Sequence, residues 1–240
     1  MSRGVYVALS GAVAQEHALE TTATNLANAA TPGYQRLRPM FREVLAGASK
    51  KENLRYAEVG GTAVDGSRGT VRATGRSLDV ALPEGHYLAV TTPRGERYTR
   101  AGALSTGADG MLKTVSGTPL VREDGKPLQL SLAAGEASIN PDGSVVQGGE
   151  IVARLKVVRA GEGTMFAHEG GALLASRGPV PVPTTTTLDV GALEDSNSTA
   201  VSAMTDLVAA SRTFEAFQRM LDTFSECDRK VLTTTPGATE

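Results

Sequence analysis

The segment from residue 200 to 231 carries the apolar pattern that most restricts the fold of this chain. Apolar residues recur there at steps of three and four, and only Asp228 breaks the series. A repeat of about 3.5 residues is that of a coiled-coil seam. Ser196 to Ser198 precede it with side chains suited to a helix N-cap. We therefore predict a C-terminal helix with one apolar face: Ala200, Ala203, Leu207, Ala210, Phe214, Phe217, Leu221, Phe224 and Val231.

A second stripe with similar spacing begins the chain. Its members are Val5, Leu9, Ala12, Glu16, Leu19, Ala23 and Leu26. This spacing predicts a helix from about Ser2 to about Ala29. The basic and apolar start also resembles a secretory signal peptide. Because Ser10 and Gly11 interrupt the apolar run and the stripe continues beyond it, we expect no cleaved leader.

The two stripes are expected to pair with each other, since nothing between them has helical length. Their large apolar side chains are few, and each contributes only about 1.5–3 kcal/mol when buried. Ordering the backbone costs about 1–2 kcal/mol per residue. A lone pair of such helices is therefore marginal, and we expect other domains or other copies of the chain to stabilise it.

The middle of the chain has the residue pattern of short β-strands rather than of helices. Short β-prone runs such as HYLAVTT and IVARLKVV alternate with turn signals at residues 107–110, 124–125 and 142–143. The predicted fold class is α+β, with terminal helices that pair in a coiled-coil-like layer and a central all-β domain. The predicted divisions are a helix at 1–35, an extended connector with little regular structure at 36–69, an outer β domain at 70–193 and a helix at 194–240.

Composition narrows the function. The net charge of −2 does not favour nucleic acid or anionic membrane as a partner, and no stretch approaches a membrane span. Cys227 is the one cysteine, and the three histidines are scattered. No catalytic set, phosphate loop or metal-ligand spacing is present. We therefore expect no enzymatic activity, no cofactor and no metal site.

Three motif blocks resemble the axial proteins of the bacterial flagellum. ATNLANAATPGYQ (Ala23–Gln35) resembles the segment ANNLAN-x-x-T-x-G-F/Y near the start of rod, hook and hook-associated proteins. YTRAGALSTGADGMLKTVSGTPLV (Tyr98–Val121) resembles their central pattern. GALEDSN (Gly191–Asn197), followed by RTFE (Arg212–Glu215), resembles their C-terminal helix. The blocks occur in the family's order. The length of the chain and its N-terminal segment RGVYVALSGAVAQ resemble those of proximal-rod members more than those of distal-rod members.

The resemblance implies a structural subunit of the flagellar basal-body rod, which crosses the periplasm. It implies export through the flagellar type III apparatus, with Phe41 and Leu45 matching an F-x-x-x-apolar signal for the export gate. The implied partners are other rod subunits and copies of the chain, packed through their terminal helices as an inner layer with the β domain outside. The alternatives are a distal-rod or hook-type subunit, or an exported enzyme that acts on the cell wall.

The breakers in TNLANAATPGYQR are interpreted as an exit from the first helix. Asn25 and Asn28 can bond groups left free where the helix ends. Pro32 disfavours helical geometry at Thr31, and Gly33 permits a left-handed turn. The candidate assembly residues at this end are Leu9, Leu19, Asn25, Leu26, Asn28, Thr31, Gly33 and Tyr34. Those of the C-terminal helix are Leu207, Phe214, Phe217, Leu221 and Phe224.

Overall fold

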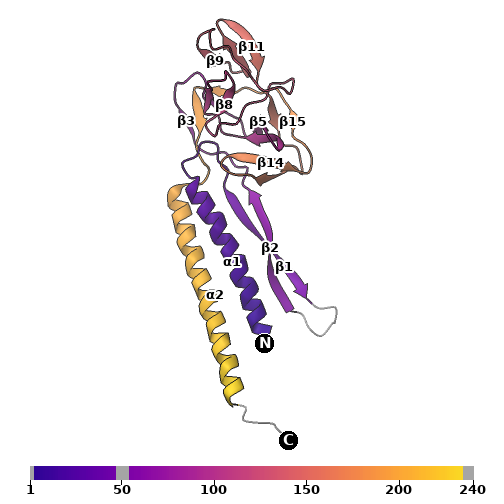
Figure 1. The fold of residues 1–240 in the computed structure, drawn as a ribbon, viewed down its shortest axis with the longest axis vertical. Helices are drawn as coiled ribbons and strands as arrows, with labels where there is room; N and C mark the ends of the chain where they lie inside the picture. The colour runs from indigo at the N-terminus through magenta and orange to yellow at the C-terminus, as the bar shows by residue number, and fades with distance from the viewer. Residues whose placement is uncertain (1–2, 47–53, 235–240) are drawn as a thin grey trace. The chain divides into compact units, whose positions relative to one another are not determined.

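The computed structural model describes residues 3–46 and 54–234. The structure has two long helices, α1 (Arg3–Ala27) and α2 (Ala200–Thr234) (Figure 1). All described strands lie between them in the sequence. The predicted α+β class is therefore confirmed. The chain forms two compact units, which we call the helical unit (residues 1–24, 38–62 and 201–240) and the β unit (residues 25–37 and 63–200). Among the described residues, no helix has the length and apolar content needed to span a membrane.

The helical unit holds α1 and α2 side by side (Figure 1), and the contacts of two glycines define their register. A Cβ on Gly11 would lie 2.4 Å from Cε1 of Phe217, and one on Gly4 would lie 3.0 Å from Cζ of Phe224. As the residue number rises on α1 it falls on α2, so the helices are antiparallel. Each glycine faces one phenylalanine, and the two contacts are one heptad apart. The absent side chains let the backbone of α1 pack directly against the two rings.

The predicted face of α2 is confirmed from Ala203 to Phe224, whereas Ala200 is exposed and the side chain of Val231 lies outside the described residues. Ala203 and Ala210 are buried, while Leu207, Phe214 and Leu221 are half-buried on a helix whose other positions are mostly exposed. The predicted face of α1 is wrong in part: Leu9 is 47% exposed and Glu16 is exposed, although Ala12 is buried. The side of α1 that meets α2 carries Gly4 and Gly11, and the buried apolar residues of α1 are all alanines, namely Ala8, Ala12, Ala14 and Ala18. A sequence pattern based on large apolar residues does not detect this face of α1, because its residues are small and allow α2 to pack closely.

We expect Gly11→Ala to loosen the helix pair, because the added methyl overlaps the Phe217 ring. Alanine favours an isolated helix over glycine by about 1 kcal/mol, so the steric term and the propensity term have opposite signs. The measurement is hydrogen exchange across α1 and α2, which should accelerate in Gly11→Ala and less in Gly4→Ala. Phe217→Leu should partly restore protection in the double variant. Slower exchange in Gly11→Ala would show that propensity decides and that the register is wrong.

The segment expected to be a connector forms two strands, β1 (Leu37–Ala46) and β2 (Leu54–Val64), which pair as a two-stranded sheet. The expectation of little regular structure there is therefore wrong. Pro39, Gly60 and Gly61 obscure the strand pattern in the sequence. In a sheet of two strands both strands are edges, where a residue without an N–H and residues without side chains are tolerated.

The β unit is built from short antiparallel strands arranged in several small sheets. Its largest sheet has the order β13-β14-β6-β5-β12-β15, and a second has the order β11-β10-β9. The β5–β6 hairpin pairs Leu88 with Thr99 and Thr92 with Gly95. The strands of these two sheets are β5 (His86–Thr92), β6 (Gly95–Thr99), β9 (Ala137–Ile139), β10 (Ser144–Gln147), β11 (Glu150–Arg154), β12 (Val157–Arg159), β13 (Met165–His168), β14 (Leu173–Arg177) and β15 (Val182–Pro183).

The remaining strands pair in twos. β3 binds β17, β4 binds β16, and β7 binds β8. β3 and β4 precede the large sheet in the sequence, and β16 and β17 follow it. The β3–β17 and β4–β16 pairs therefore connect the early and late segments of the β unit's sequence. Their bounds are β3 (Val71–Ala73), β4 (Val80–Ala81), β7 (Leu104–Thr106), β8 (Leu112–Thr114), β16 (Asp189–Val190) and β17 (Ala192–Glu194).

The core of the β unit is aliphatic. Fully buried Leu and Val side chains from many strands form one cluster, and a smaller cluster contains Tyr87, Tyr98, Val158 and Leu174. The predicted turns between strands are present and share one device. Asp109, Asp124 and Asp142 each accept a hydrogen bond from the amide two residues later, at 3.0–3.2 Å. Such Asx turns fix tight reversals without a hydrophobic contribution.

Candidate functional site

The exit from α1 is organised by the side chain of Asn25. Its Nδ2 donates to the carbonyl of Leu37 at 2.8 Å, while its Oδ1 accepts from the Leu37 amide at 2.8 Å and from the Tyr34 hydroxyl at 2.9 Å. Asn25 and Tyr34 are 4% and 1% exposed. One amide side chain thus bonds both main-chain groups of Leu37, which holds the chain in a closed reversal between residues 25 and 37.

The reversal itself depends on Gly33. Thr31 N donates to Asn28 O and Tyr34 N to Thr31 O, so two tight turns follow the helix. Gly33 has a φ of 69°, and its amide donates to the carbonyl of Glu194 at 2.8 Å. A Cβ there would lie 2.3 Å from the backbone nitrogen of Ala101. Glycine is therefore required twice, for its left-handed backbone and for the close approach of another segment.

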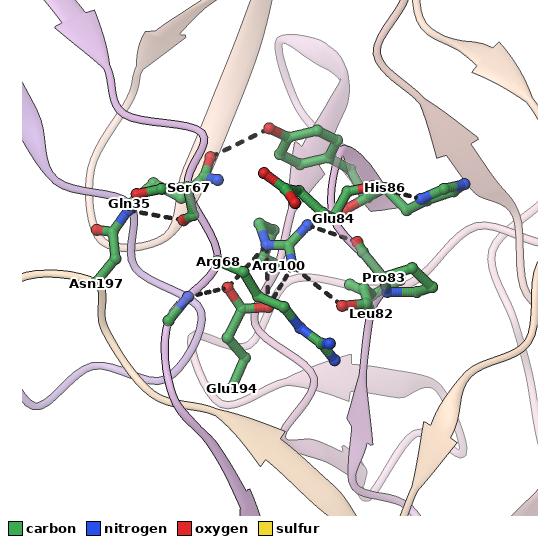
Figure 2. A network of polar contacts seen from close by, with 12 residues as sticks. Gln35, Ser67, Arg68, Leu82, Pro83, Glu84, His86, Arg100, Glu194 and Asn197 are labelled. Atoms are coloured by element: carbon green, nitrogen blue, oxygen red, sulfur yellow. Dashed lines mark hydrogen bonds and ion pairs between the residues drawn. The ribbon is translucent and has the colours of Figure 1, made fainter.

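The segment that leads into α2 contacts the same exit. Arg36 N donates to Asn197 Oδ1 at 2.6 Å, and Asn197 Nδ2 donates to the carbonyls of Asp65 and Ser67 at 2.9 Å. Figure 2 shows the side chain of Asn197 directed toward Ser67. Asn197 was expected to help cap the last helix. It instead joins three segments of the β unit that are far apart in the sequence.

A buried ion pair lies at the centre of this arrangement. Arg100, at the end of β6, pairs with Glu194 of β17, and the two side chains are 0% and 3% exposed. Arg100 Nε donates to Glu194 Oε1 at 3.0 Å, and its remaining N–H groups reach Glu194 Oε2 and the carbonyls of Leu82, Pro83 and His86. Each of the five donors of the guanidinium therefore has a partner (Figure 2).

Glu194 connects this pair to the exit from α1. Its Oε1 also accepts from the Gly69 amide at 3.0 Å, and its main-chain carbonyl accepts from Gly33. We call Asn25, Gly33, Tyr34, Arg100, Glu194 and Asn197 the exit network. All six belong to the β unit. A single buried carboxylate residue thus fixes the end of β6, the start of β3 and the turn that follows α1.

Burial raises the pKa of Tyr34 to about 12, from an ordinary value of 10.0. The folded state therefore favours the neutral phenol more than the unfolded chain does. Tyr34 contributes this stability fully below pH 10, and the contribution is lost as the pH rises from about 10 to about 12. Burial also raises the pKa of Tyr87, whose hydroxyl donates to Gln35 Oε1 at 3.4 Å. The exit network is accordingly sensitive to alkaline conditions.

Replacing Tyr34 with phenylalanine should remove one hydrogen bond and this pH dependence together. At pH 7 we expect a loss of about 1 kcal/mol in the free energy of unfolding of the β unit, since Asn25 Oδ1 keeps its bond from Leu37. At pH 11 the gap between wild type and Tyr34→Phe should shrink. Urea unfolding at both pH values measures this, with Tyr6→Phe in the helical unit as control. A gap that widens with pH would contradict the assignment.

The structure places the predicted assembly residues in three settings. Asn25, Gly33 and Tyr34 are buried in the exit network, while Leu19, Leu26, Asn28 and Thr31 are half-buried. Phe217 and Phe224 meet the glycines of α1, with Leu207, Phe214 and Leu221 on the same face of α2. Leu9 is exposed. Phe41 is 51% exposed on β1, and Leu45 belongs to the same strand, with its side chain outside the described residues.

Sequence reasoning about sites missed Gly4, Gly11, Arg100, Glu194 and Asn197. Signals for them were present. Gly4 and Gly11 are one heptad apart, as are Phe217 and Phe224. Arg100 lies in the YTRAG block, and Glu194 and Asn197 lie in GALEDSN. Nothing in either block alone indicates that they meet, because the partners are about ninety residues apart and neither charge can be recognised as buried from its neighbours.

The described part of the chain holds no group of three or more His, Cys, Asp or Glu side chains arranged for a metal ion. His86 contacts the carbonyl of Glu84, and His168 contacts that of Gly171, so these two rings serve local turns. The exit network contains an acid and a base, but they are paired with each other and sealed from solvent. Its geometry supports a rigid structural connection.

Comparison with known proteins identifies the class. Three family models match in order along the chain: "Flagella basal body rod protein" at residues 5–35, "Flagellar hook protein FlgE/F/G D1 domain" at 84–147 and "Flagellar basal body rod FlgEFG protein C-terminal" at 190–234. The first and last of these models include the exit from α1 and the segment that contains Glu194 and Asn197. The three matched segments, in this order, are those of a flagellar axial protein.

Relatives that match most of the chain show which family of axial proteins it belongs to. The basal-body rod protein FlgF of Mesorhizobium japonicum is 31% identical over 97% of this chain and 98% of its own length. The Escherichia coli FlgF is 32% identical, with 94% and 95% covered. FlgG of Agrobacterium fabrum is 29% identical, with 93% and 96% covered. The chain belongs to the FlgF family of flagellar basal-body rod proteins, and it is a structural subunit of the rod.

Proposed function

We propose that this chain occupies the proximal rod, is exported by the flagellar type III apparatus, and assembles helically through its terminal helices with other rod subunits and copies of itself. The helices form the inner layer of the array, and the β unit lies outside it. The subunit acts without catalysis. The observation that carries the proposal is the pair of helices. It retains exposed apolar side chains, and the α1 side of its interface is built mainly from glycine and alanine.

The energetics of the helix pair support assembly by docking. Small residues on α1 bury little apolar area, so the pair alone gains little free energy per ordered residue. Large apolar side chains on both helices remain exposed, including Leu9 on α1 and Met204 on α2, which is 55% exposed. Contacts with neighbouring subunits would cover them. Ordering that completes only on docking also opposes premature association during export.

The exit network supports assembly indirectly. Asn25, Gly33 and Tyr34 are too deeply buried to contact another subunit, so their proposed role is to fix where the chain leaves α1. Leu19, Leu26, Asn28 and Thr31 keep part of their surface and remain candidate contacts, as do the apolar residues of α2. In this proposal the network determines the path of the chain, and the helices supply the binding surfaces.

Substitution of the inward face of α2 should abolish incorporation into the rod. In the full-length Phe214→Asp/Phe217→Asp variant, two charges enter the helix interface, and we expect the variant to be absent from isolated basal bodies and the cells to be non-motile. The matched control is Thr213→Asp/Gln218→Asp, which places the same charges at exposed positions of α2. Hydrogen exchange should show a folded β unit in both. Normal incorporation of the first variant would refute assembly that depends on the α1–α2 pair.

Export and position need separate tests. Because export acts on an unfolded chain, the role of Phe41 is tested by secretion: Phe41→Ser should lower it, whereas Met40→Ser, at a similarly exposed position, should not. Equal secretion would remove the proposed signal. The proximal position is favoured because FlgF relatives cover nearly the whole chain at 30–33% identity. Labelling of purified basal bodies near the distal end of the rod would overturn it.

A further inference from the structure

The outward surface of α1 carries an apolar patch near its N-terminal end. Tyr6, Leu9 and Val13 are spaced by three and four residues, so they share one face of the helix. They are 51%, 47% and 44% exposed. On the same face, Glu16 and Glu20 follow the patch and are exposed. We call Tyr6, Leu9 and Val13 the α1 patch.

A second patch of equal length lies at the N-terminal end of α2. Val201, Met204 and Val208 have the same spacing of three and four residues and are 77%, 55% and 52% exposed. They lie apart from the inward face that contains Phe214 and Phe217. We call these three residues the α2 patch. Each patch spans seven residue steps of helix, so the two match in length.

Within one chain the two patches lie at opposite ends of the helix pair. Gly4 faces Phe224 and Gly11 faces Phe217, which puts Tyr6 level with Asp222 rather than with Val208. The difference is about fourteen residues, or roughly 21 Å at ~1.5 Å per residue. The patches of one molecule therefore cannot cover each other. Two copies in the same orientation bring them together if one copy is shifted along the helices by that distance.

Charge favours the same shift. Antiparallel alignment of Val13 with Val201 places Glu16 beside the N-terminal end of α2. The first turn of α2 contains no acidic residue of its own. A carboxylate near a helix N-terminus is stabilised by the helix dipole and the free N–H groups, by about 0.3–1 kcal/mol at exposed sites. The opposite alignment, with the two helices parallel, places Glu20 level with Glu215, a like charge.

We propose that the α1 patch of one copy docks antiparallel on the α2 patch of a second copy of this chain, with the copies offset by about 21 Å along the helices. This inference rests on the proposed assembly through the terminal helices. The contact is heterologous, since it joins two different surfaces, and each copy presents its second patch to the next copy. Such a contact propagates along a filament instead of closing into a dimer.

Cross-linking between two singly substituted full-length chains tests the offset. One chain carries Leu9→Cys and a size tag, the other carries Met204→Cys, and both carry Cys227→Ser to remove the native thiol. They are expressed together in cells that build rods, and isolated basal bodies are treated with a short bifunctional thiol reagent. The matched control replaces Met204→Cys with Asp222→Cys, which lies on the same side of α2 five turns further along, at about 27 Å.

We expect a cross-linked product of the two chains for Leu9→Cys with Met204→Cys and at least a tenfold lower yield for the control pair. A higher yield for the control, a product of two Leu9→Cys chains, a product with a chain of another size, or no product in rods that contain both chains would each overturn the proposed contact. In those cases the chains are still incorporated, so assembly through the helices stands. Absence of the unsubstituted chain from rods would instead refute the proposed function.

Discussion

Gly33→Ala is expected to destabilise the β unit by more than 3 kcal/mol. A residue with a Cβ at a φ of 69° costs about 1–3 kcal/mol. The added methyl would also lie 2.3 Å from two backbone atoms, Ala101 N and Arg100 C, which no side-chain rotation can relieve. Moving this backbone away would strain the bond from the Gly33 amide to Glu194 and disturb the Arg100 pair. Denaturant unfolding followed by tyrosine fluorescence measures the loss, because three of the five tyrosines lie in the β unit.

Gly117→Ala separates the two causes. Gly117 has a φ of 80° in the same unit, but a Cβ there would have no atom within 4 Å. It should therefore show the backbone cost alone, about 1–3 kcal/mol. If both variants lose the same stability, the close packing of the exit against Arg100 and Ala101 contributes nothing, and the exit network is not the constraint that we describe.

Arg100→Met should cost about 3–5 kcal/mol, since it leaves Glu194 buried without its partner. It also removes the donors that satisfy the carbonyls of Leu82, Pro83 and His86. Arg100→Lys should recover little of this loss, because an ammonium group has three donors and cannot reproduce the geometry of five. The measurement is again the free energy of unfolding of the β unit, with hydrogen exchange at Gly33 and Gly69 as a local readout.

The control is the exposed pair of Arg154 and Asp142, whose side chains are 40% and 47% exposed and lie 2.7 Å apart. Arg154→Met should cost less than about 1 kcal/mol, as exposed pairs contribute little. The double variant Arg100→Met/Glu194→Leu should be more stable than Arg100→Met alone, because the unpaired charge is gone. Equal losses in Arg100→Met and Arg154→Met would show that the buried pair has no special role in stability.

Periodicity predicted the helices better than it predicted their contacts. The face of α2 follows from large apolar residues at steps of three and four, and large residues are what a periodic pattern detects. The face of α1 was not predicted, because Gly4 and Gly11 add nothing to a hydrophobic pattern. Their role is evident only from their contacts with Phe224 and Phe217. The strands β1 and β2 escaped for a related reason, since Pro39 and the Gly60–Gly61 pair are read as breakers without knowledge that both strands are edges.

The exit network was predictable in position but not in content. The cluster of breakers from Asn25 to Gly33 marked where α1 ends and why glycine is needed. The partner of that turn could not be inferred, because Arg100 and Glu194 meet only after the strands between them have folded. Buried ion pairs depend on the full three-dimensional arrangement, so no local pattern distinguishes them from the many charged residues that remain in solvent.

The most direct test of the account is a density map of the assembled rod in which this subunit can be traced. We predict that α1 and α2 lie in the inner layer, that Gly11 faces Phe217 within each subunit, and that the outward apolar side chains of both helices are covered by neighbouring subunits. A map in which the rod contacts are made by the β unit, while the outward faces of α1 and α2 remain in solvent, would contradict assembly through the terminal helices.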